Sequence, residues 1–382
     1  MVIQQVESNL SLEKLALSKE IFMGVIAGRN ILFSEADQRL FEINDMAAYI
    51  WRSIEDGLQQ EAILNEMVAQ GLNRRLAETY LNTALLEWTR LGLMRPEPRS
   101  CVVLDETPSC QDVMIAGISV RIRYAASVGS IIAPIFEHLE SKRESRGAAS
   151  DMTFDVCDQG EQIHVLRNGS WLWSCPRDEI ATTLKGQLLD EVLESADYEL
   201  AFHAAALVRN GRMLLVGGHP GAGKTTLTLA LVNAGFGFAG DDLALLHSDG
   251  QVTGVPFAPA VKAGAWELAA RYRPDIHCTP IFRRPDRKRV RYPTPVGLVP
   301  AESYPVGWLM VLDRRPGAGA ALTPIDPIRA VGWMLQDSYA QSHRLTPTGF
   351  NAIRHAIEHA EYYRLTYSHL EDAVELLHQI CR

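Results

Sequence analysis

Residues 212–225 read RMLLVGGHPGAGKT, and this stretch decides which fold to expect. The apolar run Met213–Val216 predicts a buried strand, and Gly218–Thr225 fits the pattern G-x-x-x-x-G-K-[ST]. Glycines let the backbone curl so that successive N–H groups point at phosphate oxygens. A helix expected over Thr225–Ala234 adds the partial positive charge of its N-terminus. The stretch therefore predicts a strand, an anion-binding loop and a helix, which is the ordering of an α/β layer fold.

The side chains of this loop indicate which ligands to expect. Lys224 can reach the β- and γ-phosphates of a nucleotide, and the Thr225 hydroxyl can coordinate Mg²⁺. ATP and Mg²⁺ are therefore the expected cofactors, although the sequence does not distinguish ATP from GTP. The expected nucleotide-binding residues are Gly218, Gly221, Ala222, Gly223, Lys224, Thr225 and Thr226. A chance glycine-rich turn is the weaker alternative, because a strand precedes the motif and a helix follows it.

A second signal, Gly240-Asp241-Asp242, ends an expected strand 17 residues after Lys224. Two adjacent carboxylates beside a phosphate loop suit a magnesium ligand and a proton acceptor. The residues alone leave open which carboxylate has which role, and they also fit a solvated turn. His203 lies in the apolar run 200–208, where a histidine is more often a satisfied core residue than a catalytic one.

Phe202-His203-Ala204, the glycine-rich loop and the two aspartates together resemble the bacterial HPr kinase/phosphorylase family. The short distance from the loop to the aspartates is also similar to that in ATP-dependent phosphoenolpyruvate carboxykinase. The resemblance covers about residues 100–380 and is specific over 200–245. It implies an α/β P-loop kinase core, in which Asp241 is the base toward a seryl hydroxyl and His203 and Lys224 complete the catalytic group. Asp242 is then the carboxylate on the metal side, together with Thr225.

The segment after the aspartates departs from the family members that act on the sugar-transport phosphocarrier. Those members have a Glu-containing signature there, whereas Val255–Gly264 reads VPFAPAVKAG. It resembles the divergent HPr-kinase-like enzymes found beside peptide-modification genes. The phosphocarrier substrate and the reverse phosphorylase activity are therefore left open. Lys262 is a candidate phosphate or substrate contact, and the alternative is an ordinary surface lysine.

A basic run follows at Phe282–Arg291, which reads FRRPDRKRVR. One interpretation is a mobile loop whose arginines, with Arg289 and Arg291 as candidate contacts, neutralise the transferring phosphate or bind an acidic peptide. A solvated loop is an equal alternative. Nucleic acid is a distant third, because no aromatic interleaving or recognised fold accompanies the run.

The beginning of the chain predicts a small winged-helix-like α+β domain. The expected strands are Phe22–Ala27, Asn30–Phe33 and Leu40–Ile43, and the expected helices are Asp45–Ile54, Leu58–Ala69 and a third from Asn73 to Gly92. The sequences ILF, LFEIN and AAYIW within Ile31–Trp51 resemble the PqqD family, which recognises leader peptides of ribosomally made, modified peptides. In that family the leader adds a strand to the sheet edge and packs on the third helix. A scaffold or oligomerisation domain is the alternative.

Three segments are expected along the chain. Residues 1–98 form the PqqD-like domain, and the proline-containing stretch Arg95–Arg99 is the best linker candidate. Residues 99–190 are rich in strand signals, with a turn expected at Asn168-Gly169. They carry no recognised chemistry and support the next segment. Residues 191–382 form the P-loop catalytic domain, in which Phe350–Cys381 is expected to be largely helical.

Composition narrows the class of protein. The chain has 382 residues, 47% hydrophobic and 22% charged, with a formal net charge of −9. This balance argues against a general nucleic-acid or membrane-surface binder. There is no CxxC pair, no basic and apolar signal peptide and no apolar run long enough to span a bilayer. A cytoplasmic protein is therefore expected.

The two resemblances together imply a kinase fused to a leader-recognition domain. The expected function is ATP-dependent phosphorylation of a Ser or Thr hydroxyl on a ribosomally synthesised precursor peptide, recruited through its leader. Two alternatives remain, an ATPase switch that gates a partner enzyme and a peptide-delivery partner without turnover. The acceptor residue and the oligomeric state, including a homo-oligomer, are left open.

Overall fold

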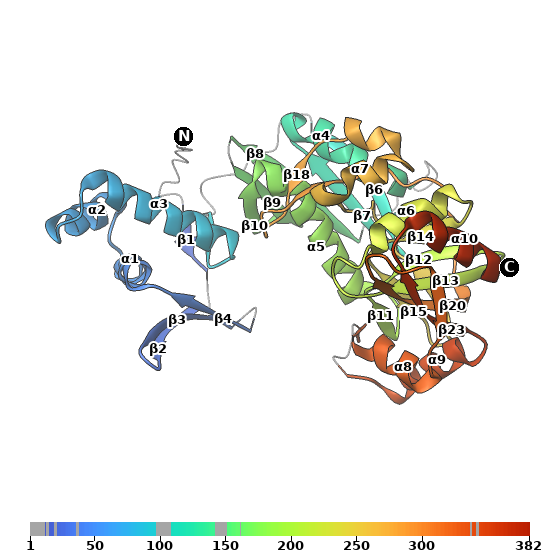
Figure 1. Ribbon diagram of the computed structural model, residues 1–382. Helices are drawn as coiled ribbons and strands as arrows, with labels where there is room; N and C mark the ends of the chain where they lie inside the picture. The colour runs from blue at the N-terminus through green and yellow to red at the C-terminus, as the bar shows by residue number, and fades with distance from the viewer. Residues whose placement is uncertain are drawn as a thin grey trace. The chain divides into compact units, whose positions relative to one another are not determined.

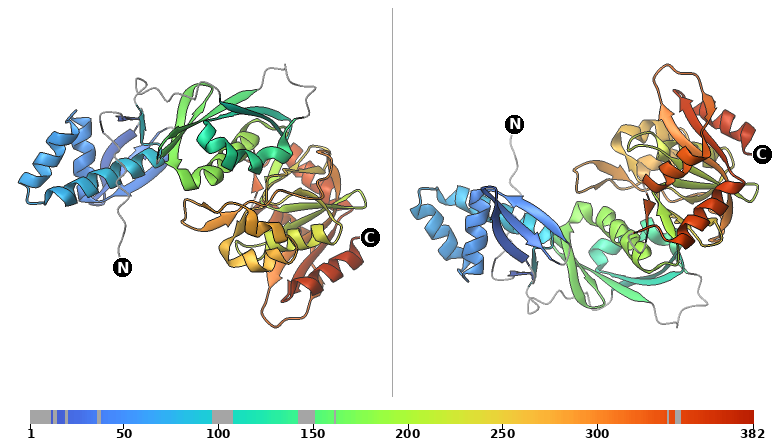
Figure 2. Two further views of the ribbon diagram at one scale, coloured as in Figure 1. Left: turned by 90° about the horizontal axis from the view of Figure 1, so that it is seen from above. Right: turned by 90° about the horizontal axis from the view of Figure 1, so that it is seen from below.

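The computed structural model describes residues 12, 15–18, 21–35, 38–96, 108–141, 151–160, 162–336, 338–340 and 344–382. Residues 97–99 of the expected linker lie outside the described residues. Contacts divide the chain into two compact units (Figures 1 and 2). Unit 1 comprises Met1–Cys110, Ile122–Val128 and Met152–Arg177, and unit 2 comprises Gln111–Arg121, Gly129–Asp151 and Asp178–Arg382. The three expected segments remain a prediction.

The elements predicted near the beginning of the chain are confirmed. The strands β2 (Ile21–Ile26), β3 (Arg29–Ser34) and β4 (Arg39–Ile43) form an antiparallel sheet, and the helices are α1 (Asp45–Glu55), α2 (Gln60–Ala69) and α3 (Arg74–Arg90). The side chains of Asn44 and Asn73 each accept a hydrogen bond from a backbone N–H in the first turn of α1 and α3. Gly92, with φ +75°, ends α3 in the left-handed conformation that favours glycine.

The apolar faces of these elements meet in one core. Leu32 of β3 and Trp51 of α1 are completely buried, and the Trp51 ring meets that of Trp88 in α3 edge-on, with 5.0 Å between ring centroids. Alternation along the strand and three- and four-residue spacing along the helices place these side chains on the inner faces. The spacing of apolar residues in the sequence therefore accounts for this core.

Strand signals in the middle of the chain are also confirmed. Asn168 and Gly169 have φ values of 51° and 79° and form the predicted turn between two antiparallel strands. The remaining elements up to residue 180 are β1 (Leu15–Leu17), β5 (Met94–Pro96), β6 (Ser109–Ile115), β7 (Ile118–Tyr124), α4 (Ala126–Phe136), β8 (Met152–Gln159), β9 (Gln162–Arg167) and β10 (Ser170–Pro176).

Unit 2 contains a ten-stranded mixed sheet with the path β14-β12-β13-β20-β16-β15-β11-β22, in which β23 lies beside β20 and β21 beside β23. The pairs β13–β20 and β20–β23 are parallel. The sheet strands are β11 (Leu200–Phe202), β12 (Ala205–Arg209), β13 (Arg212–Gly217), β14 (Gly237–Gly240), β15 (Ala244–Leu246), β16 (Gln251–Gly254), β20 (Tyr304–Arg314), β21 (Ala321–Pro324), β22 (Ser338–Tyr339) and β23 (Glu361–Tyr367). The helices are α5 (Ile180–Ser195), α6 (Lys224–Asn233), α7 (Trp266–Ala270), α8 (Pro327–Gln336), α9 (Pro347–Glu358) and α10 (Leu370–Ile380).

Helices cover both faces of this sheet, as the α/β pattern predicts. Leu214 and Val216 of β13 belong to a core with α6 and α10, whereas Met213 and Leu215 belong to a core with α8 and α9 (Figure 1). Both faces of β13 are buried, and this explains why its sequence is a continuous apolar run instead of an alternating one. The glycine-rich loop therefore extends from the centre of a layered fold.

Two elements in this part of the chain were not predicted. Phe350–Cys381 is largely helical, as expected, but the strand β23 separates α9 from α10. The sequence EYYRLTY of β23 is rich in residues that favour strands, and it pairs with both β20 and β21. No helix was predicted over α5, which runs across residue 190, the expected boundary between the second and third segments. No helix among the described residues combines the length and the apolar character needed to cross a membrane.

Candidate functional site

The glycine-rich loop joins β13 to α6, as predicted. Gly223 is the N-cap of α6 and has φ +99°, in the left-handed region that favours glycine. A Cβ at this position would lie 2.9 Å from the Tyr367 hydroxyl, which itself donates a hydrogen bond to the Ala222 carbonyl at 3.2 Å. Both the backbone conformation and the close approach of Tyr367 therefore require glycine at residue 223.

The polar side chains that follow the loop are held by backbone groups and by one aspartate. Lys224 Nζ donates to the Gly218 carbonyl at 2.7 Å, so its ammonium lies folded back over the loop. Thr226 Oγ1 donates to the Gly223 carbonyl at 2.9 Å. Thr225 Oγ1 instead donates to Asp241 Oδ2 at 2.8 Å. This last hydrogen bond brings together the two strongest signals in the sequence, the loop and the aspartate pair.

Asp241 lies directly after β14 and is almost completely buried, with 1% of its surface exposed. Burial, and next the negative charge of Asp242, raise the pKa of Asp241 to about 7. Its Oδ1 is buried and accepts no hydrogen bond from the described residues. A buried carboxylate oxygen without a partner is unfavourable, and it marks a place where a proton or a ligand is expected.

The close crossing of two chain segments sets the position of Asp241. Gly240 lies against the backbone of Val255, so that a Cβ at residue 240 would come within 2.6 Å of the Val255 carbonyl oxygen. Backbone atoms cannot move aside as the end of a side chain can. The glycine before the aspartates is therefore needed for the approach of β14 to the segment that follows β16.

Asp242 is held by two residues. Its carboxylate forms an ion pair with Lys185 Nζ, and its backbone carbonyl lies 3.0 Å from His203 Nδ1. Burial alone would raise the pKa of Asp242, but the Lys185 ammonium outweighs it and lowers the pKa. The pKa values of the two neighbouring aspartates are therefore shifted in opposite directions. His203 itself is exposed, at the edge of this cluster.

Sequence reasoning missed Lys185, which lies in the segment expected to carry no chemistry. Its side chain is only 7% exposed, and its Nζ lies 5.7 Å from the centroid of the Phe257 ring and 5.6 Å from that of Tyr292. The sequence pattern could have indicated this residue, because Lys185 lies on the buried face of α5 together with Ala181, Leu184 and Leu188. A lysine within the apolar stripe of a helix needs a partner.

Lys262, Arg289 and Arg291 lie together on a small three-stranded sheet formed by β17 (Val261–Lys262), β19 (Arg289–Arg291) and β18 (Phe282–Arg283). The basic run is thus a β-hairpin, and not an irregular loop. Arg291 donates to the carbonyls of Ile276, His277 and Thr279 at 2.5–2.8 Å. Lys262 and Arg289 are exposed, and the Arg289 guanidinium stacks 5.5 Å from the Trp266 ring centroid. The contacts of Arg291 therefore hold the chain, whereas Lys262 and Arg289 face solvent.

The donor set near Asp241 is suitable for Mg²⁺ together with a nucleotide. Among the described residues, no group of three or more His, Cys, Asp and Glu side chains is arranged to hold a metal ion. Mg²⁺ does not require such a group, because it is usually bound by one or two carboxylates, substrate phosphates and water. The Thr225 hydroxyl and the partly exposed Asp242 carboxylate supply oxygen donors of this kind.

Comparisons with known proteins give two structural similarities. No protein-family model and no curated protein matches the chain. Of the 31 solved chains that match, one is TbiB1 in complex with the TbiA(beta) leader peptide, at 20% identity and a TM-score of 0.20, over 21% of this chain and 93% of that chain. Another is the Hpr(Ser) kinase/phosphatase from Coxiella burnetii, at 12% identity and a TM-score of 0.22, over 47% of this chain and 90% of that chain.

Proposed function

We propose that this chain transfers the γ-phosphoryl group of ATP to a Ser or Thr hydroxyl of a ribosomally synthesised precursor peptide. The observation that carries the proposal is the hydrogen bond from Thr225 to Asp241, because it joins the glycine-rich loop to the two aspartates. A carboxyl group whose pKa is about 7 suits a general base that works near neutral pH. Phosphoryl transfer needs positioning, charge stabilisation and such a proton acceptor.

Each residue of the cluster has one role in this reaction. Lys224 and the loop N–H groups bind the phosphates, and Asp241 accepts the proton of the acceptor hydroxyl at Oδ1. Asp242 and Thr225 hold the metal side of the site, while His203 supports the backbone of Asp242. When bound, Mg²⁺ and ATP supply charge neutralisation and the transferable phosphoryl group.

Residues 1–98 bind the leader of the peptide in this proposal. The small sheet ends in two edge strands, β2 and β4, either of which can accept an added strand. On α3, Leu76 and Tyr80 are apolar, four residues apart and 40% and 41% exposed, so they offer a surface for an apolar leader residue. The resemblance to the PqqD family supports this assignment.

The exposed cations Lys262 and Arg289 contact the peptide near its acceptor residue. The hairpin that carries Arg289 is connected to the site, because Tyr292 follows β19 directly and its ring lies against the Lys185 ammonium. Acidic or phosphorylated groups are the natural partners of such cations. This assignment predicts a peptide with acidic or phosphorylated groups near the acceptor, and it does not identify the acceptor residue.

Intact mass spectrometry after incubation with ATP, Mg²⁺ and a precursor peptide encoded beside the protein tests the proposal. A gain of one phosphoryl group, lost when the peptide lacks its hydroxyl acceptors, supports the kinase. Release of ADP without peptide modification supports an ATPase switch and contradicts the proposal. Peptide binding without either product supports a delivery role. Lys224→Ala is the matched control, because it removes the phosphate-binding ammonium from the loop.

A further inference from the structure

Lys185 is a buried cation whose contacts lie around the aspartate pair. Its ammonium forms an ion pair with Asp242, and the rings of Phe257 and Tyr292 lie within 6 Å of it. Replacing a buried ion pair by apolar residues is often neutral or even stabilising, so stability gives little reason to keep a lysine here. A role in the site accounts for its position better.

Phe257 and Tyr292 are themselves held in place, so the surroundings of Lys185 are built from several elements. His138 Nε2 lies 2.7 Å from the carbonyl oxygen of Pro256, the residue before Phe257. The Tyr292 hydroxyl donates to Thr182 Oγ1 at 3.1 Å, one turn before Lys185 on α5. A cation between two fixed rings has few alternative positions. Lys185 thus links the Asp242 carboxylate to the helix α5.

Asp242 is consequently held both at its carboxylate and at its backbone carbonyl. Lys185 binds the carboxylate at Oδ2, and His203 contacts the backbone carbonyl. The side chain of Asp242 remains 28% exposed, so that part of the carboxylate faces the site. Fixing a ligand carboxylate through a second residue is a general way of tuning a metal site.

We propose that Lys185 is a positioning residue that fixes the Asp242 carboxylate for phosphoryl transfer, an inference that rests on the proposed function. The competing explanation is a purely structural ion pair. A structural pair would affect folding, whereas a positioning residue affects turnover of the folded enzyme.

Steady-state kinetics on full-length Lys185→Ala and Lys185→Met test the proposal. Removing a supporting residue of this kind typically costs about 10–100-fold in metal affinity or activity, so we expect kcat for peptide phosphorylation at saturating ATP and Mg²⁺ to fall by that factor. Propylammonium should restore part of the activity of Lys185→Ala, and the neutral propanol should not, because the missing feature is a charge. Equal kcat in wild type and Lys185→Met, or equal restoration by both compounds, would overturn it.

Leu184→Ala is the matched control, since Leu184 is the completely buried neighbour of Lys185 on α5. It should lower the melting temperature and leave kcat of the folded enzyme unchanged. If Lys185→Ala does not fold, Lys185→Met decides, because it retains the packing volume and water can reach the Asp242 carboxylate.

A second measurement separates this proposal from the proposed function. If the wild-type protein forms no phosphopeptide, the proposed function fails. The role of Lys185 is then tested by calorimetry, which measures how much Mg²⁺ increases the affinity for ATP. We expect Lys185→Met to reduce that gain about tenfold, as for other residues that support a metal ligand, and Leu184→Ala to leave it unchanged. An unchanged gain in Lys185→Met would overturn the positioning role.

Discussion

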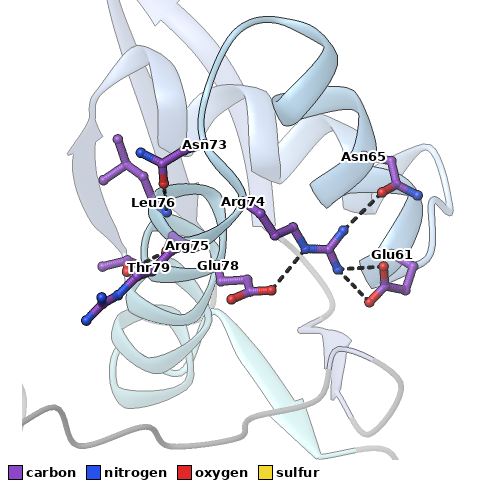
Figure 3. Close-up of polar contacts among 8 residues, drawn as sticks. All are labelled: Glu61, Asn65, Asn73, Arg74, Arg75, Leu76, Glu78 and Thr79. Carbon is purple, nitrogen blue, oxygen red and sulfur yellow. Dashed lines mark hydrogen bonds and ion pairs between the residues drawn. The ribbon is translucent and has the colours of Figure 1, made fainter.

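Two cations of this protein, Arg74 in the N-terminal domain and Lys185 in α5, show how differently an ion pair can function. Arg74 makes more contacts, because its guanidinium binds Glu61 and Asn65 of α2 and Glu78 of α3 at 2.6–3.0 Å (Figure 3). Its side chain is 40% exposed and those of Glu61 and Glu78 are 72% and 47% exposed. Water competes for every one of these groups, so such a cluster contributes little to stability.

Lys185 has one carboxylate partner and is 7% exposed. Burial opposes its charge, but the nearby Asp242 carboxylate outweighs burial and raises the pKa of Lys185. Removing one member of a buried pair leaves the other without compensation. The two cations therefore differ in burial, and burial, unlike the number of contacts, makes the charge of Lys185 costly to leave without its partner.

The largest effect is expected for Lys224, whose ammonium lies over the glycine-rich loop. Lys224→Ala should abolish phosphoryl transfer while the protein remains folded, because this lysine serves as a point charge for phosphate. Phosphopeptide formation measures the loss of phosphoryl transfer, and circular dichroism shows whether the variant is folded. Lys288→Ala, an exposed lysine of the hairpin, is the control and should be active. Unchanged turnover in Lys224→Ala would end the phosphate-loop assignment.

Asp241→Asn should lower phosphorylation by about 10²–10⁴-fold and retain ATP binding, since an amide cannot accept the proton. Single-turnover kinetics and nucleotide titration measure the two quantities. Asp242→Asn is the companion variant at the neighbouring, partly exposed carboxylate. If Asp242→Asn is the slower variant and Asp241→Asn is close to wild type, the roles of the two aspartates are reversed.

An effect of about tenfold is expected on the exposed face of α3. Leu76→Glu together with Tyr80→Glu should weaken binding of the isolated leader peptide by about that factor, the usual cost of losing an apolar anchor. High peptide concentration should restore phosphorylation, because only effective concentration is lost. Calorimetry measures the affinity. Val68→Glu, at an exposed apolar position of α2, is the control, and an unchanged affinity in the double variant would contradict leader binding by this face.

A pH-dependent difference in stability follows from the burial of Asp241. Its carboxyl binds a proton more tightly in the folded chain, where its pKa is about 7, than in the unfolded chain, where the value is 3.8. This contribution to stability is complete below pH 3.8 and is lost as the pH rises through about 7. Asp241→Asn should therefore become more stable relative to wild type over this range. The melting temperatures of both proteins are measured between pH 3.8 and about 7. A constant difference between them over this range would contradict the raised pKa of Asp241.

The smallest effect is expected for Arg74→Ala, despite the several contacts of Arg74. The midpoint of urea unfolding and the phosphorylation rate should both remain at the wild-type values, because the cluster is exposed. A clear loss of stability in Arg74→Ala would mean that contact number does matter in this molecule, and the comparison with Lys185 would fail.

Most secondary structure was predictable because it depends on local patterns. Asn44 and Asn73 indicated helix starts, Asn168-Gly169 indicated a turn, and Met213–Val216 indicated a buried strand. The strand β23 was not predicted, because its sequence EYYRLTY lies between two helical patterns and is held by pairing with β20 and β21, which are distant in sequence. Pairing partners cannot be read from a local pattern.

The sequence by itself determined the chemistry that this protein can carry: a glycine-rich loop with Lys224 and Thr225, two adjacent aspartates, and His203. Which of these side chains meet was decided only by the tertiary structure. The approach of β14 to the first turn of α6 brought Asp241 to Thr225, and the packing of α5 brought Lys185 to Asp242. The physical reason is that burial and electrostatic coupling depend on distances in space. Asp241 and Asp242 are the same residue type and are adjacent in the sequence, yet the pKa of Asp241 is raised and that of Asp242 is lowered.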